Sequence, residues 1–398
     1  MKLSVVTMLA LFLALAAPAA RAYDPANPRT PSEFAIIFVA GYAGDHLPQD
    51  AAKFEAVVKA CKEAHYNVIL TKYTDERAEI CRRHGMKLIP DMLVPDHHIY
   101  RNVEGAEALG KRLRDSDVVY AYHLWSDRVG GTVAGRSRDI ANMRRWDPNH
   151  PAYVGDYRAS AIGALENPDI IGYYDFHWSR GGLYRYLNRA MDAARKHDVP
   201  FLKYADPTPG QPGQGNYNRA LFTLSQSAVF GLRGYMYHYR GNVHLNLDTA
   251  EWGIVGEDLK RVNAHLAPLG PKLMQLGNPL AVYSTPCTKD AKDRPVDRPA
   301  VPAGLNPIPD DFWARISRGE VLVGDYRYPS GPDGRKALLL ANHNAYQPQS
   351  VEFTLASPDG ATVMHFDRDE GDWKPLTPAA GVWRLTVAPA GLELIHVQ

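Results

Sequence analysis

The chain has 398 residues, of which 45% are hydrophobic and 22% charged, and its formal net charge is +1. This is ordinary globular composition, and the length favours one large domain with a smaller one. The near-neutral charge provides no strong field for nucleic acid or for an anionic membrane, so neither is expected as a partner.

The first 22 residues have the pattern of a secretory signal peptide. Lys2 supplies the positive start, residues 3–16 form an apolar run too short to span a bilayer comfortably, and an A-x-A site ends at Ala22. No later apolar run is long enough to cross a membrane. We therefore expect a secreted or periplasmic protein without membrane contact after cleavage near Ala22.

Short apolar runs then alternate with amphipathic helical patterns in eight successive units. The expected strands span residues 34–40, 67–71, 87–90, 118–124, 151–154, 170–174, 200–204 and 234–239. The expected helices span residues 49–65, 75–84, 104–114, 137–146, 160–166, 183–197, 218–230 and 255–276. Eight such units predict a (β/α)₈ TIM barrel. The competing fold, an open doubly wound sheet, usually carries a G-x-G-x-x-G loop after its first strand, and that motif is absent.

Helical periodicity ends after Leu276, and strand-like runs separated by turn signals follow. The expected strands span residues 281–284, 312–316, 321–326, 337–341, 351–355, 382–387 and 392–397, with a Pro- and charge-rich loop over residues 286–311. This pattern predicts a small antiparallel β-sandwich. The expected domains are the signal peptide (1–22), the barrel (23–277) and the sandwich (278–398).

Three cysteines remain after cleavage, Cys61, Cys81 and Cys287. Cys61 and Cys81 fall on consecutive expected helices and could pair in an exported protein, but three buried thiols fit equally. Residues 96–98 read Asp-His-His, yet adjacent histidines rarely converge on one ion and no third ligand is suitably spaced. We expect no metal and no cofactor.

Active sites of TIM barrels are built where the strands end, and the residues there are polar and aromatic in this chain. Two carboxyl groups hydrolyse a glycosidic bond, while aromatic faces stack on sugar rings and basic groups bind acidic substituents. The expected substrate-binding residues are Asp45, Asp91, His123, Trp125, Arg128, His177, Trp178, Lys203, Tyr204, Tyr237 and His238.

A barrel followed by a β-sandwich resembles the clan A glycoside hydrolases, in which the catalytic acids follow strands four and seven. The matching positions are Asp127 and Asp206, where that clan carries Glu, and Arg128 stands beside Asp127. Residues 173–178 are also similar to the strand-six motif of family 18 chitinases, whose strand-four Glu is missing here. We expect Asp127, Asp175 and Asp206 to converge as the catalytic carboxyl groups.

The sequence therefore predicts a secreted glycoside hydrolase with a polysaccharide or glycan substrate. The alternative is a catalytically inactive barrel that binds carbohydrate, because the usual Glu pair is absent. Any single Asp in these loops could instead cap a helix or pair with a nearby arginine. The sugar, the linkage, the stereochemical outcome and the oligomeric state stay open.

Overall fold

The computed structural model describes residues 29–31, 33–41, 46–126, 131–156, 158–175, 180–208, 216–289, 295–331 and 333–398. The expected signal peptide therefore lies outside the described residues. Eight parallel strands form the central sheet: β1 Ala35–Val39, β2 Val68–Thr71, β3 Lys87–Pro90, β4 Tyr122–Trp125, β5 Ala152–Asp156, β6 Ile170–Asp175, β7 Phe201–Ala205 and β8 Leu232–Tyr237. Their order is β3-β2-β1-β8-β7-β6-β5-β4, and isolated parallel bridges at Leu88–Val119 and Asp91–His123 join β3 to β4. The sheet is a nearly closed barrel, which confirms the predicted fold.

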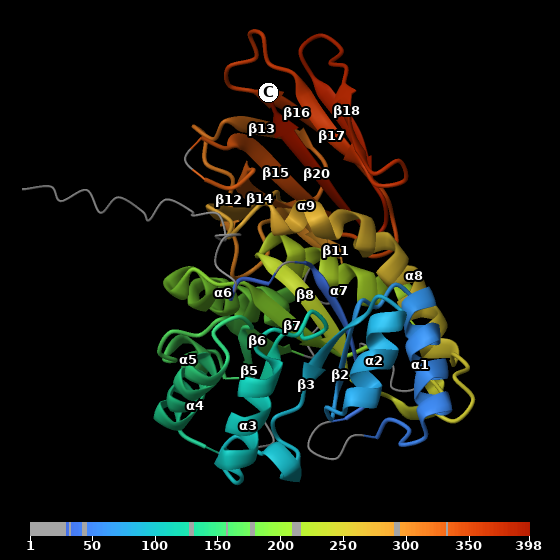
Figure 1. Ribbon diagram of the computed structural model, residues 1–398. Helices are drawn as coiled ribbons and strands as arrows, with labels where there is room; N and C mark the ends of the chain where they lie inside the picture. The colour runs from blue at the N-terminus through green and yellow to red at the C-terminus, as the bar shows by residue number, and fades with distance from the viewer. Residues whose placement is uncertain are drawn as a thin grey trace, which may run out of the picture.

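Helices connect the successive strands on the outside of this barrel (Figure 1). They are α1 Ala51–Glu63, α2 Asp75–Arg83, α3 Val103–Leu113, α4 Val133–Trp146, α5 Ala159–Gly163, α6 Arg180–His197, α7 Tyr217–Val229, α8 Ile254–Leu266 and α9 Gly270–Met274, with 3-10 turns η1 Pro95–His97, η2 Gly241–Val243 and η3 Ala267–Leu269. The single helix expected over residues 255–276 is divided into α8, η3 and α9. Pro268 and Pro271 lie at this division, and neither has a backbone N–H to continue the helical ladder.

The barrel interior is filled by a layer of side chains from alternate strand positions. It contains aliphatic residues of β1, β2 and β3 together with the rings of Tyr153, Tyr174 and Tyr204. Gly172 has the Tyr153 ring against it, and Gly155 has the Tyr174 ring against it; a Cβ at either glycine would lie 2.4–2.5 Å from those side chains. The two glycines therefore leave the space that the inward tyrosines occupy.

The C-terminal residues form antiparallel sheets, as expected. Their strands are β9 Ala281–Ser284, β10 Cys287–Lys289, β11 Pro295–Ala300, β12 Asn306–Pro307, β13 Ala314–Arg318, β14 Val321–Tyr328, β15 Arg335–Asn342, β16 Gln349–Leu355, β17 Val363–Asp367, β18 Asp372–Leu376, β19 Trp383–Val387 and β20 Leu392–Val397. A seven-stranded sheet and the three-stranded sheet β13-β16-β19 share one apolar core. The segment expected as a loop over residues 286–311 contains the pair β10–β11 and the short strand β12, and the hairpin β17–β18 was not expected.

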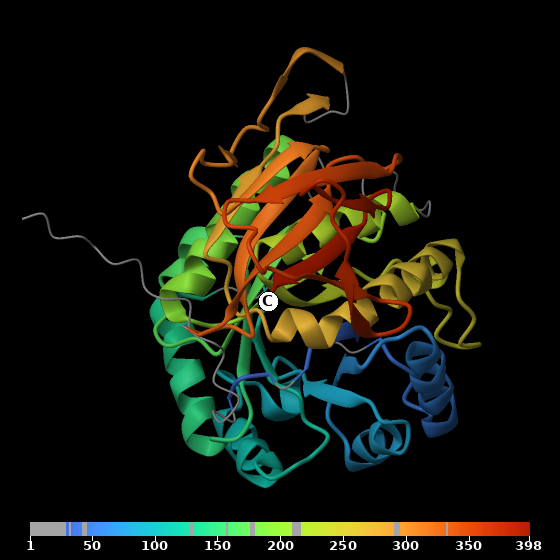
Figure 2. The ribbon, with the colours of Figure 1, turned by 90° about the horizontal axis from the view of Figure 1, so that it is seen from above.

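The β domain packs on the side of the barrel formed by α6, α7 and α8 (Figures 1 and 2). Apolar side chains of both domains share one core cluster, and buried polar contacts cross it as well: His343 lies within hydrogen-bond distance of the Tyr184 hydroxyl at 2.8 Å and of the Ser284 hydroxyl at 2.9 Å. The Tyr326 hydroxyl also donates to the carbonyl of Val229 at the end of α7, at 2.8 Å. These bonds join the two domains directly.

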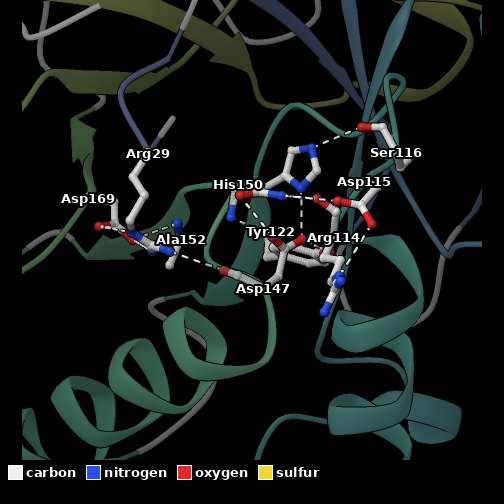
Figure 3. A network of polar contacts seen from close by, with 10 residues as sticks. Arg29, Arg114, Asp115, Ser116, Tyr122, Asp147, His150, Ala152 and Asp169 are labelled. Carbon is white, nitrogen blue, oxygen red and sulfur yellow. Dashed lines mark hydrogen bonds and ion pairs between the residues drawn. The ribbon is translucent and has the colours of Figure 1, made fainter. Parts of the chain in front are cut away.

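A second polar network lies at the end of the barrel where the strands begin (Figure 3). Arg29 pairs with the carboxylate of Asp169, which also accepts the backbone N–H of Ala152 at 2.9 Å. Asp147 accepts from the Tyr122 hydroxyl at 2.6 Å and lies 2.7 Å from the ring of His150. The network fixes the start of the described chain against this end of the barrel.

The three cysteines are free and buried. Burial raises the pKa of Cys61 well above its usual range and that of Cys81 to about 12, so both thiols stay protonated. Among the described helices, none combines the length and the apolar character needed to cross a bilayer.

Candidate active site

The floor of the barrel mouth is formed by inward side chains at the carboxyl ends of the strands. At β3 and β4, His123 Nδ1 donates to the Asp91 carboxylate at 2.9 Å, and both residues are buried. A carboxylate only accepts, so Nδ1 carries the proton of this hydrogen bond. The His123 ring stacks on Tyr153 at 5.4 Å, which holds it across the barrel axis.

On the opposite side of the barrel, the ends of β6, β7 and β8 carry a cluster of two tyrosine rings and one imidazole ring. The Tyr174 and Tyr204 rings lie 5.0 Å apart, and the Tyr204 hydroxyl is 2.7 Å from Nδ1 of His238. His238 is partly exposed, whereas the two tyrosines are buried. The predicted residues Asp91, His123, Tyr204 and His238 therefore all lie at the mouth.

Asp206 begins the loop after β7. Its carboxylate accepts from Arg240 at 2.9 Å and from the backbone N–H and hydroxyl of Thr208, and 18% of its side chain is exposed. Arg240 follows β8, so this salt bridge joins the ends of two neighbouring strands. The arrangement gives the mouth a partly exposed carboxylate held by an arginine.

The strand register brings a second predicted carboxyl position close by. In the β6–β7 pair, Asp175 is opposite Ala205, the residue immediately before Asp206. The side chain of Asp175 lies outside the described residues, as do Asp127, Asp45, Arg128, His177 and Trp178. The backbone alone therefore places the Asp175 and Asp206 positions at adjacent strand ends.

Trp125 does not have the open face that sugar stacking requires. Tyr100 stacks on the indole at 5.2 Å and 15°, and the Arg136 guanidinium lies 5.0 Å from the ring centroid. The indole N–H donates to Asp139 at 3.1 Å, and the side chain is buried. Trp125 is therefore packed within the protein in the described part of the chain, and its expected stacking on a sugar stays a prediction.

Two further predicted residues face the helices rather than the mouth. Lys203 is buried with its ammonium 3.4 Å from the hydroxyl of Ser227 on α7. The Tyr237 ring contacts Tyr235, whose hydroxyl bonds Asn263 of α8. Adjacent strand residues point to opposite sides, so Lys203 and Tyr237 lie on the outer face while Tyr204 and His238 lie on the inner one. Both side chains therefore point away from the inward residues of the mouth, and their contact with substrate stays a prediction.

The sequence reasoning did not single out the buried network behind β4 and β5. Asp156 pairs with Arg136 of α4 and with Arg158, whose Nη2 is 3.0 Å away. Burial opposes ionisation of Asp156, but the hydrogen bonds from Arg158 and Arg136 overcome it and lower its pKa. Asp156 follows Gly155, whose Cβ position faces the inward Tyr174 ring, so the Asp156 side chain lies on the outer face of the barrel.

The Asp-His-His segment after β3 is divided among different contacts. Asp96 pairs with Lys72 at 2.6 Å, and burial lowers the pKa of both His97 and His98. Within the described ranges, no three or more His, Cys, Asp or Glu side chains gather in a way that could hold a metal ion.

No protein-family model matches the chain, and no curated protein matches its sequence. Solved structures do share its architecture. A β-galactosidase from Rahnella sp. R3 matches with a TM-score of 0.51 and 11% identity, over 93% of this chain and 99% of that one. An α-amylase from Anoxybacillus, described as a new glycosyl hydrolase subclass, matches with a TM-score of 0.50 and 8% identity, over 91% and 97% of the two chains. The predicted resemblance to glycoside hydrolases is thus confirmed at the level of the fold.

Proposed function

We propose that the chain hydrolyses a glycosidic bond of a polysaccharide or glycan bound at the C-terminal mouth of the barrel. The observation that supports this most strongly is the set of polar and aromatic residues at the carboxyl ends of the strands: the Asp91–His123 pair, the Tyr204–His238 pair and the partly exposed Asp206. Hydroxyl-rich rings need hydrogen-bond partners and flat apolar faces, and carboxyl groups supply the chemistry.

Asp206 is the proposed carboxylate that attacks the anomeric carbon or activates a water molecule. Arg240 pairs with its charged form, as this role requires. Asp127, which follows β4, would protonate the oxygen of the leaving sugar. Water then supplies the hydroxyl to the anomeric carbon and returns a proton to the acid, so the overall reaction consumes one water.

The test measures reducing-end release from a panel of polysaccharides and aryl-glycosides. Asp206→Asn should lower turnover by about 10²–10⁴-fold with little change in stability. Asp117→Asn is the matched control, because Asp117 also pairs with one arginine but is 71% exposed and lies far from the mouth beside Arg82. Full activity of Asp206→Asn on a substrate that the wild type cleaves would refute the assignment.

Carbohydrate binding without hydrolysis is the second candidate. It is favoured by one observation, the engagement of the Asp206 carboxylate by Arg240 and Thr208, which restrains the group that must react. Binding across the panel with no release of reducing ends from any substrate would select this function.

We also propose that the protein is exported with cleavage after Ala22, on the basis of its N-terminal pattern. N-terminal sequencing of the protein from a secreting host tests this directly. A mature chain starting at Tyr23 is the expected result, and an intact Met1 in the cell interior would contradict it.

A further inference from the structure

A groove on the outer surface of the barrel lies between α5 and α6. It is an open groove with a volume of about 670 Å³. Its lining residues are Arg158, Ser160, Gly163, Arg189, Asp192, Ala193 and Lys196. The lining contains no aromatic and no large aliphatic side chain, so it suits a polar ligand.

The groove exists because α5 is short. This helix has 5 residues, whereas α6, which packs beside it, has 18. The two helices approach at small residues, since a Cβ on Gly163 would lie 4.0 Å from that of Ala193. Lys196 Nζ donates to the carbonyl of Gly163 at 2.7 Å and ties the end of α5 to α6.

The charge of the groove is positive. Three of its side chains are basic and one, Asp192, is acidic. Arg189, Asp192 and Lys196 are exposed, and within the described ranges Arg189 forms no hydrogen bond or ion pair. The whole chain has a net charge of only +1, so this local excess is not a consequence of a generally basic protein.

The groove begins at the rim of the mouth. Arg158 lines it and also pairs with Asp156, the last residue of β5.

We propose that this groove binds the carboxylate or sulfate groups of an acidic polysaccharide, as a contact additional to the mouth. Guanidinium and ammonium groups form charge-assisted hydrogen bonds with such anions. That the anion belongs to a glycan rests on the proposed function; the anion preference rests on the groove alone.

The test uses fluorescently labelled dextran sulfate and polygalacturonate, with neutral dextran as the uncharged probe, and measures binding by anisotropy in 20–200 mM salt. The variant is Arg189→Gln with Lys196→Gln. Its matched control is Arg315→Gln with Arg318→Gln, two exposed arginines of β13 that remove the same charge elsewhere. Hydrolysis of a short neutral substrate is measured in parallel.

Wild type should bind both acidic polymers more tightly than dextran, and the affinity should fall as salt rises. The groove variant should lose about tenfold in affinity for them, while the control changes little. Equal losses in the two variants, or an unchanged groove variant, would overturn the proposal. Turnover of the neutral substrate separates the two hypotheses. If the wild type does not turn it over, only the proposed hydrolysis is refuted. If the wild type turns it over but the groove variant binds the acidic polymers as tightly as the wild type, only the groove proposal is refuted.

Discussion

Replacement of Asp156 by Asn should strongly destabilise the barrel without abolishing its chemistry. Asp156 is fully buried and Arg136 is 2% exposed, so their salt bridge lies in the protein interior behind β5. Loss of the carboxylate leaves the Arg136 guanidinium without its charge partner. Breaking a buried pair in this way costs about 3–5 kcal/mol, which is a large part of the 5–15 kcal/mol that ordinarily stabilises a folded domain.

The pH dependence has a defined sign. Hydrogen bonds from Arg158 and Arg136 outweigh the effect of burial, so the pKa of Asp156 is lower in the folded than in the unfolded chain, where it is about 3.9. Its contribution to stability is therefore complete above about pH 4 and is lost as the pH falls through the folded pKa. Asp156→Asn should lack this part of the acid transition.

Urea unfolding followed by far-UV circular dichroism measures the change in the free energy of unfolding. Asp117→Asn is again the control, because it removes the same charge from an exposed pair and should leave the urea midpoint nearly unchanged. The double variant Asp156→Leu with Arg136→Met should recover much of the lost stability, since neither charge is then buried. A loss below about 1 kcal/mol in Asp156→Asn would refute this reasoning.

Two further substitutions test other buried groups. Burial raises the pKa of Asp139 to about 6, above the unfolded value, so ionisation costs stability as the pH rises from about 4 to 6. Asp139→Asn keeps an acceptor for the Trp125 indole N–H. Its free energy of unfolding, measured with urea, should rise by about 2 kcal/mol at pH 7.5 but change little at pH 4. Equal effects at both pH values would contradict this. His343→Ala should cost about 3 kcal/mol, because it leaves the buried hydroxyls of Tyr184 and Ser284 without this partner. Calorimetry should show one transition at a lower temperature, and an unshifted barrel transition would show that the domain junction does not stabilise the barrel.

Local sequence signals accounted for the element order. N-cap side chains mark several helix starts: Asp50, Thr74 and Asn216 each accept a backbone N–H of the first turn. Thr132 does the same for α4, which begins at Val133 rather than at the expected residue 137. The barrel and the β domain were predictable because eight alternating units and the later turn-rich pattern depend on near neighbours in the chain.

The sequence alone determined that polar and aromatic residues gather where the strands end, and only the tertiary structure decided which of them face the mouth. Both faces of a parallel barrel strand are buried, so its hydrophobic pattern does not reveal which residues point inward. Tyr204 faces the barrel interior and Lys203 faces α7 for this reason. Trp125 shows the same limit, since Tyr100 and Arg136 come from other elements to cover the faces of its ring. Such contacts depend on the packing of distant segments, which no local pattern encodes.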